Sequence, residues 1–226
     1  PECGSLARRK IVSSPAIHAT TSGRLALSIA LATKFAAPGG VRTTAVLPLE
    51  STAVLSSPFT RALSTAQLAT AGLDLRVRAD ERLRERDFGA FDGMTGAGIR
   101  EQFPDEARRR DLLGKFYYRP PGGESWADVA LRIRSLLTTE ALRHDGHRLL
   151  VVAHQAVVMV FRYVLEELTE QELLDEDRRE QVANTSLTRY DADADGTLHL
   201  TSFNVVDHLV AESEDVTEEP DAAPGP

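Results

Sequence analysis

Two basic residues lie close after strand-like stretches of this sequence, and both residue types bind anions. Val54-Leu55 runs into Ser56-Ser57-Pro58, and Arg61 follows one turn into an expected helix. His154 follows the apolar run 149–153 directly. Ligands of open α/β sheets bind at the carboxyl ends of strands, where helix N-termini point N–H groups at anions, and a guanidinium there holds a phosphate through two hydrogen bonds. Taken singly, Arg61 fits a surface arginine too, and a lone histidine is more often merely accommodated in a fold.

Two acidic residues lie in turn-like segments between these basic residues. Glu85 stands in Leu83-Arg84-Glu85-Arg86-Asp87-Phe88-Gly89. A carboxyl group in a partly desolvated pocket has a raised pKa and can act as a general acid, although the flanking arginines fit an ordinary ion pair equally well. Glu124 follows Pro120-Pro121-Gly122-Gly123, whose glycines permit a close approach of backbone to a ligand. A purely structural helix start explains this second segment equally well.

These side chains need elements that bring them to one place, and the pattern supplies alternating strands and helices. Helices are expected over residues 58–71, with Ser57 as N-cap, over 124–142 and over 156–168. The continuous apolar run 149–153 is typical of a strand buried on both faces of a parallel sheet, and 186–190 with 197–203 predicts a hairpin. The sequence therefore predicts an α/β fold, a three-layer sandwich with a mostly parallel central sheet flanked by helices.

In order and spacing, these segments resemble the histidine phosphatase superfamily, the phosphoglycerate mutase-like family. The matching segments are Ser56-Ser57-Pro58-x-x-Arg61-Ala62, Leu83-Arg84-Glu85-x-x-Phe88-Gly89, Gly123-Glu124-Ser125, Val151-Val152-Ala153-His154 and Asn184-Thr185-Ser186. The resemblance implies a phosphohistidine intermediate, with Arg61 and His154 holding the phosphate oxygens and Glu85 protonating the leaving oxygen. It implies hydrolysis or isomerisation of a small phosphate monoester without metal or cofactor. The predicted phosphate-binding set is completed by Ser57, Glu124, Ser125 and Gln155, the last at a position where the family usually has glycine.

The nucleophile departs from the family pattern. The family carries it in an Arg-His-Gly triplet that closes the first strand, and no such triplet occurs in this chain. Thr20-Thr21-Ser22-Gly23-Arg24 resembles the segment that follows the triplet, with a helix expected over 25–36, so the triplet is expected farther upstream. His18 is the one histidine before residue 144, and its context fits a loop histidine better. Three interpretations stay open: a first strand lost before Pro1, a member that binds phosphate ligands without turnover, or an unrelated N-terminal segment joined to a family body.

Composition bounds the partners and the organisation of the chain. The formal charge of -8 does not favour binding of the whole chain to nucleic acid or to an anionic membrane. A small phosphorylated metabolite is therefore the expected partner, and a homodimer stays open. Cys3 is the single cysteine, which excludes an internal disulfide and a cysteine-built zinc site and suits a cytoplasmic location. We expect an atypical N-terminal segment over 1–19, a histidine phosphatase-like domain over 20–210 and an acidic disordered tail over 211–226.

Overall fold

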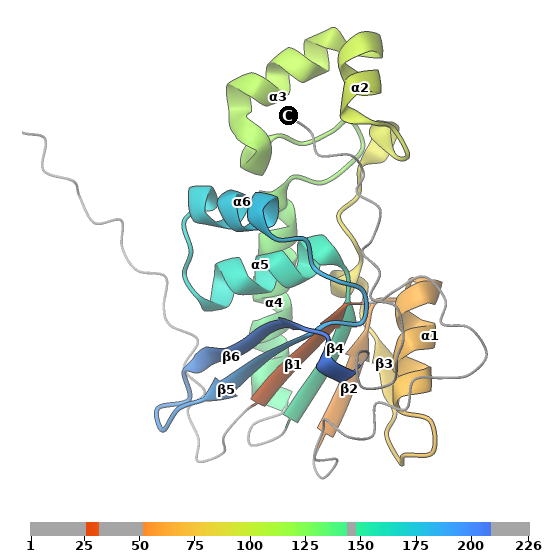
Figure 1. The fold of residues 1–226 in the computed structure, drawn as a ribbon, viewed down its shortest axis with the longest axis vertical. Helices are drawn as coiled ribbons and strands as arrows, with labels where there is room; N and C mark the ends of the chain where they lie inside the picture. Colours follow the sequence, from red (N-terminus) through yellow and green to blue (C-terminus); the bar gives the residue numbers. More distant parts are fainter. Residues whose placement is uncertain (1–25, 32–51, 144–147, 209–226) are drawn as a thin grey trace, which may run out of the picture.

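The computed structural model describes residues 26–31, 52–143 and 148–208 (Figure 1). Strands and helices alternate along most of the chain, and two single-turn helices, Glu81–Leu83 and Gly89–Phe91, lie between β3 and α2. The strands are β1 (Ala26–Leu31), β2 (Thr52–Ser56), β3 (Val77–Ala79), β4 (Arg148–Ala153), β5 (Leu187–Ala192) and β6 (Leu198–Val205). The helices are α1 (Thr60–Ala69), α2 (Gly96–Gln102), α3 (Pro104–Tyr117), α4 (Trp126–Arg143), α5 (Gln155–Leu165) and α6 (Glu170–Arg179).

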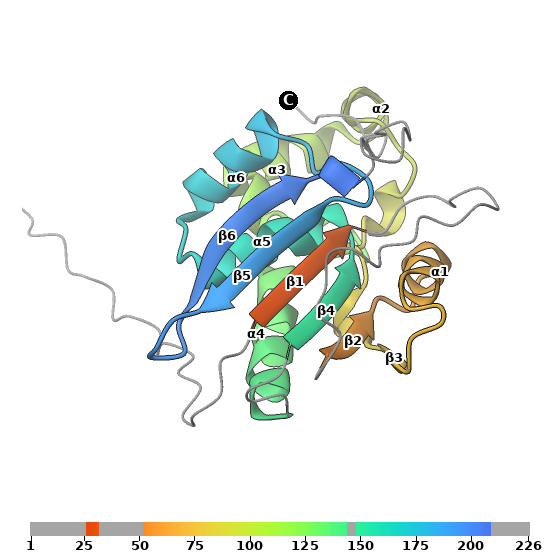
Figure 2. The same cartoon turned by 60° about the horizontal axis from the view of Figure 1, so that its bottom comes forward.

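All six strands belong to one sheet, in the order β3-β2-β4-β1-β5-β6 (Figure 2). The first four in this order run parallel, whereas β5 is antiparallel to β1, and β6 is antiparallel to β5. In the register of the sheet, Leu31 of β1 pairs with Ala153 of β4, and Ser56 of β2 pairs with Val152. The carboxyl ends of β1, β2 and β4 therefore meet at one edge, and Ser57 and His154 follow two of these ends directly.

Helices cover both faces of the sheet, and alternate residues of β4 divide between them. Leu149, Val151 and Ala153 pack with buried residues of α4, α5 and α6. Leu150 and Val152 pack instead with the small buried residues of α1. Because successive side chains of a strand point to opposite faces, an unbroken apolar run serves both layers. The predicted three-layer α/β sandwich with a mostly parallel sheet is confirmed, and α2 and α3 lie beyond the layers, at the top of Figure 1.

Two expectations about individual elements were wrong. The helix expected over 25–36 is contradicted, because Ala26–Leu31 forms a strand, β1, between β4 and β5. Its sequence alternates larger apolar residues with alanine and serine, a spacing of two that suits a strand, and a short apolar run does not by itself separate the two states. Ser57 is not the N-cap of α1 either: the helix begins at Thr60 after Phe59, although the Ser57 hydroxyl accepts a hydrogen bond from the Phe59 N–H at 3.3 Å.

The other expected elements are confirmed with shifts of a few residues at their ends, in α4, β4, α5 and the β5–β6 hairpin. None of the described helices combines the length and the hydropathy of a membrane-crossing helix. The predicted segments 1–19 and 211–226 lie outside the described residues, so the boundaries of the domain predicted over 20–210 stay a prediction.

Candidate active site

Arg61 and His154, which are 93 positions apart in the chain, are in direct contact at the carboxyl edge of the sheet. The Arg61 Nε–H donates to His154 Nδ1 at 3.1 Å, and Nη2 lies 2.9 Å from the same atom. On the other side of the ring, His154 Nε2 lies 2.8 Å from the Ser57 hydroxyl. The Phe59 ring meets the imidazole edge-on, with 5.3 Å between the ring centroids. Three of the residues predicted from sequence therefore form one connected group.

These contacts determine where the imidazole carries its proton. Arginine has donors and no acceptor, so Nδ1 must present its lone pair to Arg61. The ring is then neutral, its proton is on Nε2, and Nε2–H donates to Ser57 Oγ. The side chain is fully buried, and burial, followed by the charges of Arg61 and then Arg132, lowers the pKa of His154 to about 3. Since Arg132 contributes, it lies within electrostatic range of the same ring.

The lowered pKa of His154 predicts a specific dependence of stability on pH. An unfolded chain takes up the proton near the ordinary value of 6.5, whereas the folded protein does so only near 3. Between these values the unfolded state binds more protons, so the free energy of unfolding falls as the pH drops through this window, by up to ~1.4 kcal/mol per pH unit for this group. Urea unfolding of wild type and His154→Gln at several pH values measures the effect, and the variant should lose this part of the slope. An identical slope in both proteins would show that His154 contributes nothing.

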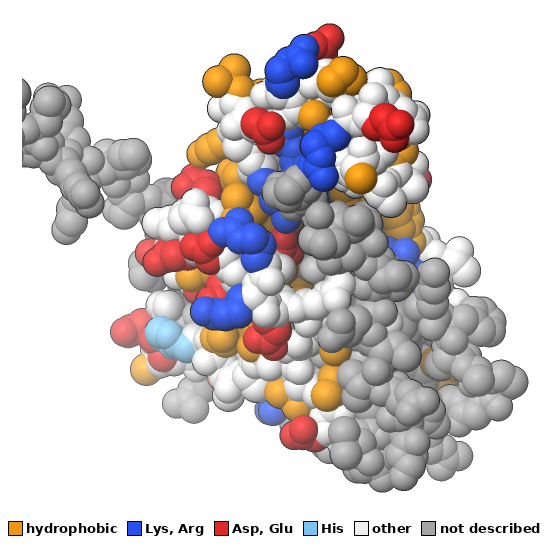
Figure 3. Space-filling view, turned by 45° about the horizontal axis from the view of Figure 1, so that its top comes forward, with side chains coloured by type: hydrophobic (Ala, Val, Ile, Leu, Met, Phe, Trp, Pro, Cys, Tyr) orange, Lys and Arg blue, Asp and Glu red, His pale blue; other side chains and the backbone are white. Residues whose placement is uncertain are grey.

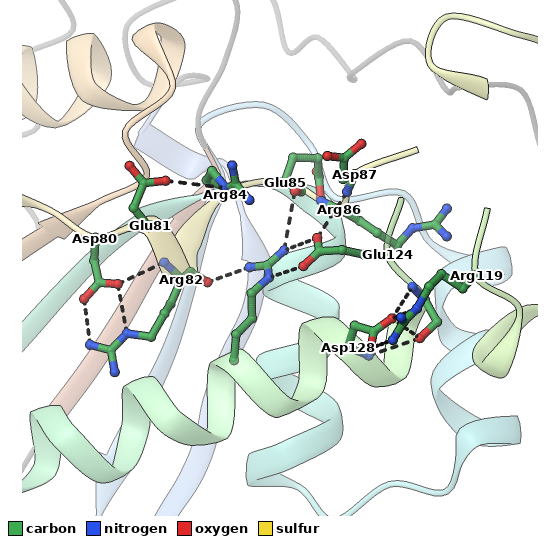
Figure 4. Close-up of polar contacts among 12 residues, drawn as sticks. Asp80, Glu81, Arg82, Arg84, Glu85, Arg86, Asp87, Arg119, Glu124 and Asp128 are labelled. Carbon is green, nitrogen blue, oxygen red and sulfur yellow. Dashed lines mark hydrogen bonds and ion pairs between the residues drawn. The ribbon is translucent and has the colours of Figure 1, made fainter. Parts of the chain in front are cut away.

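Figure 4 shows Glu85 close to Glu124. Arg132, a residue of α4, bonds to both residues. The Arg132 Nε–H donates to Glu124 Oε1 at 3.0 Å and Nη2–H to Glu124 Oε2 at 3.1 Å, a two-pronged ion pair. The same guanidinium donates to the backbone carbonyls of Arg82 and Glu85. The Glu85 carboxylate accepts a hydrogen bond from the Arg86 N–H at 2.7 Å. Arg132 thus holds the backbone of the Glu85 loop, residues 83–89, against the start of α4.

The Glu85 loop also interlocks with the Pro-Pro-Gly-Gly turn through backbone contacts. The Glu124 N–H donates to the Asp87 carbonyl at 2.8 Å, and the Ala90 N–H donates to the Pro121 carbonyl at 2.9 Å. Gly89 adopts a φ of +55°, and a Cβ there would lie 2.2 Å from the Pro121 carbonyl oxygen. The two segments approach so closely because neither has a side chain at the point of contact.

Gly89→Ala should therefore destabilise the protein more than Gly93→Ala does. Gly93 also has a positive φ, of +73°, but nothing lies within 4 Å of an added Cβ, so it serves as the matched control. The shared backbone strain costs roughly 1–2 kcal/mol, and the clash at Gly89 adds roughly 1–3 kcal/mol. Urea unfolding of the two variants measures the difference. Equal losses in the free energy of unfolding of the two variants would mean that the Pro-Pro-Gly-Gly turn shifts to accommodate the added methyl group without an energetic cost.

The remaining predicted site residues have different surroundings. Ser125 is buried, and its hydroxyl donates to Asp128 Oδ2 at 2.7 Å while its own N–H donates to the same oxygen. These bonds secure the start of α4, so the described contacts of Ser125 are structural and its role in binding stays a prediction. Gln155 is half-buried as the first residue of α5, directly after His154, and its predicted role is likewise untested.

Sequence reasoning missed Arg132 and Phe59. A signal for Arg132 was present, since it interrupts the apolar face of α4, three residues after Val129 and next to Ile133, both fully buried. A charged residue on a core-facing stripe needs a partner. Phe59 carries no comparable signal, because an aromatic residue early in a helix ordinarily packs in a core. Within the described ranges, no three His, Cys, Asp or Glu side chains converge in a way that suits a metal ion.

Comparison with known proteins agrees with this geometry. The family model of the histidine phosphatase superfamily (branch 1) matches residues 44–205. The Bifunctional protein Rv2228c of Mycobacterium tuberculosis is 40% identical over 115 residues, which are 50% of this chain and 31% of that protein. The chain thus spans about a third of the length of the first curated relatives that it matches. A 2,3-bisphosphoglycerate-dependent phosphoglycerate mutase of Azorhizobium caulinodans is 31% identical over 148 residues, which cover 63% of this chain and 69% of the mutase.

Solved structures share the fold. YhfR of Bacillus stearothermophilus aligns with a TM-score of 0.68 at 22% identity, over 82% of this chain and 99% of that chain. A mycobacterial glucosyl-3-phosphoglycerate phosphatase in complex with inorganic phosphate aligns with a TM-score of 0.64 at 22% identity, over 81% of this chain and 98% of that chain. Among these relatives are a phosphoglycerate mutase and a phosphatase. The family match covers well over half of the printed sequence, and the chain therefore belongs to the histidine phosphatase superfamily (branch 1).

Proposed function

We propose that this domain binds the phosphoryl group of small phosphate monoesters at Arg61 and His154 and hydrolyses the ester through a phosphohistidine intermediate. The observation that carries the proposal is the direct contact of Arg61 with His154 at the carboxyl edge of the parallel strands. The N-terminus of α5 directly follows His154, and helix N-termini favour anions. Membership of a family of phosphatases and mutases supports the class of reaction.

In the proposed reaction, a histidine nitrogen attacks phosphorus and the bond between phosphorus and the ester oxygen breaks. The Glu85 carboxyl gives its proton to that oxygen, which leaves as an alcohol. Water then attacks the phosphohistidine, gives a proton to the Glu85 carboxylate and releases inorganic phosphate, so that both groups return to their first state. Arg61 and the Nε2–H of His154, which meets Ser57 in the structure, compensate the charge on the phosphoryl oxygens.

The attacking histidine is proposed to precede the described residues. In the family it closes the first strand, and β1 ends at Leu31, opposite Ala153 and so beside His154. The residues that follow β1 in the sequence, 32–51, lie outside the described part and contain no histidine. His18, which also lies outside that part, is the one candidate before the family body within the printed sequence.

Binding without turnover is a second candidate function, and one sequence fact favours it. Residues 19–143 contain no histidine, so neither β1 nor the segment after it carries the expected nucleophile. A domain with Arg61 and His154 in place would then still recognise a phosphate group. Such a member would act as a sensor or carrier of a phosphorylated metabolite.

One experiment separates the two candidates. The purified chain is incubated with para-nitrophenyl phosphate in the presence of a chelator, and the release of nitrophenol is followed beside the binding of inorganic phosphate by calorimetry. Turnover that disappears in Arg61→Ala supports hydrolysis, and His18→Ala then tests the nucleophile. Saturable phosphate binding without turnover, lost in Arg61→Ala, supports the second candidate. If the chain neither binds nor turns over, both candidates are wrong.

A further inference from the structure

Phe59 is a large apolar side chain at the rim of the site, and no step of the proposed reaction uses it. The residue is 42% exposed and belongs to neither of the two apolar clusters of the core. Its ring approaches the His154 imidazole edge-on, with 5.3 Å between the ring centroids. The ring therefore lies against a residue of the proposed phosphate pocket and leaves much of its own surface open to solvent.

The position of Phe59 in α1 does not account for its residue type. Phe59 is the N-cap of α1, where serine, threonine, aspartate and asparagine are preferred because their side chains accept hydrogen bonds from the first turn. No side-chain cap is present on α1 among the described residues, and its first turn contains no acidic residue. A phenylalanine at this position thus contributes neither to the cap nor to the apolar core. Single exposed apolar residues are common on protein surfaces, but this one lies against the buried imidazole of the site.

A phosphate ester held at Arg61 and His154 brings its alcohol portion close to the Phe59 ring. Arg61 donates to His154 Nδ1 at 3.1 Å, and Phe59 contacts the same imidazole, so a phosphoryl group on both basic residues lies near the ring. His154 is fully buried, and the strand behind it, β4, is packed on both faces by the core. The alcohol portion therefore extends toward the exposed side of the site, which Phe59 borders.

The geometry points to Phe59 as an apolar wall for the alcohol portion of the substrate, and so to phosphate monoesters of aromatic or apolar alcohols as the preferred substrate class. This inference rests on the proposed function, because Phe59 meets an alcohol only when the phosphoryl group is held at Arg61 and His154. An apolar alcohol covers exposed surface of the Phe59 ring, and an offset or edge-on contact between two rings adds to the gain from apolar area. Phe59 is thus a specificity-determining residue that takes no part in proton or phosphoryl transfer.

Binding of phosphonates tests the inference whether or not the chain turns substrates over, because these compounds have no ester bond to hydrolyse. The probes are ethylphosphonate and benzylphosphonate, in which a methylene group replaces the ester oxygen of methyl phosphate and of phenyl phosphate. We expect the wild-type chain to bind benzylphosphonate about 10-fold more tightly than ethylphosphonate in calorimetry. In Phe59→Ala this ratio of affinities should fall below about threefold, because most of the apolar wall is gone.

Two further variants of Phe59 separate the aromatic ring from its apolar area. Phe59→Tyr retains the ring and should retain the gain. Phe59→Leu retains apolar area without a ring, so its ratio should fall between those of the wild type and Phe59→Ala. Urea unfolding checks that each variant is folded, and Phe59→Leu decides the test if Phe59→Ala is not.

Phe103→Ala and Leu68→Ala are the matched controls. Phe103 is 40% exposed between α2 and α3 and packs against Phe91 at 5.1 Å, at an end of the molecule where apolar side chains are scattered among charged ones (Figure 3). Leu68 is 49% exposed near the other end of α1, roughly 14 Å along the helix from Phe59. Neither variant should change the ratio of the two affinities. Arg61→Ala should weaken the binding of both phosphonates alike.

The outcomes separate this inference from the proposed function. If ethylphosphonate binds but benzylphosphonate binds no better, or if the full gain survives in Phe59→Ala, the apolar wall is wrong and the proposed function stands. A control variant that lowers the ratio as much as Phe59→Ala does would also refute the wall. If neither phosphonate binds, the proposed function and the apolar wall both fail.

Discussion

Arg61→Ala is expected to weaken the binding of inorganic phosphate by about 100-fold and to remove any phosphatase activity. A guanidinium that holds a phosphate through two charge-assisted hydrogen bonds contributes about 3 kcal/mol, which corresponds to this factor. The change also acts on His154, because Arg61 donates to its Nδ1 and its charge helps to lower the pKa of the ring to about 3. In Arg61→Ala that pKa should therefore rise. Calorimetry measures the first effect, and NMR titration of the imidazole measures the second.

Arg84→Ala is the matched control for Arg61→Ala. Arg84 belongs to the Glu85 loop, is exposed, and pairs only with Glu81 at 3.6 Å among its described contacts. The Arg84→Ala substitution removes the same charge without affecting a contact of His154. The affinity for phosphate should therefore change by less than about twofold, as for a screened surface charge. Arg61→Lys restores the charge but not the two-pronged geometry and should fall between wild type and Arg61→Ala. If Arg61→Ala binds phosphate as tightly as wild type, Arg61 is not part of a phosphate pocket.

Arg132→Met is expected to lower the free energy of unfolding by about 3 kcal/mol and kcat by about 100-fold for poor leaving groups. The Arg132 side chain is 14% exposed, and its guanidinium forms the ion pair with Glu124 together with hydrogen bonds to the carbonyls of Arg82 and Glu85. Its loss leaves a half-buried carboxylate without its partner, which is the costly way to break such a pair. The backbone around Glu85 then loses its bonds to Arg132, and a misplaced proton donor slows the departure of the alcohol.

Two readouts distinguish positioning by Arg132 from a general loss of stability. An alkyl phosphate needs its leaving oxygen protonated, whereas para-nitrophenyl phosphate releases para-nitrophenolate readily as an anion, so the loss in kcat should be much larger for the alkyl ester. The charge of Arg132 also helps to lower the pKa of His154, so this pKa should rise in Arg132→Met even if the chain has no turnover. Arg134→Met, two residues on and stacked over Tyr163 at 5.4 Å, is the control that should change neither. Equal losses for both esters would refute the positioning role.

The location of the nucleophile is the question on which catalysis depends. The expectation of a helix over 25–36 placed the first strand, and with it the histidine, farther upstream. The structure instead has β1 at Ala26–Leu31, in the centre of the sheet, while the family model begins only at residue 44. The proposed phosphate-binding residues Arg61 and His154 therefore lie within the part that the family model matches, whereas His18 lies outside it. Turnover and phosphate-binding measurements on the wild type and on His18→Ala decide between hydrolysis and binding without turnover.

Sequence alone determined the fold class, and it predicted a site at the carboxyl edge of the sheet with the residues Ser57, Arg61, Glu85, Glu124 and His154. It could do so because these depend on local information: an apolar run such as 149–153 makes a buried strand, and the residue after such a strand faces the ligand edge. The same local reasoning failed at 25–36, where a short apolar run fits a helix and a strand equally and the neighbouring strands decide the outcome.

Tertiary structure alone decided how these residues act on one another. The neutral state of His154 follows from Arg61, 93 positions away, and from the burial of the ring. The contact that holds the Glu85 backbone comes from Arg132 of α4, 47 positions away. Protonation and ion pairing are properties of an environment built from distant segments. Residue types and spacing determine which groups are available, whereas packing determines which of them are charged, paired or left to bind a ligand.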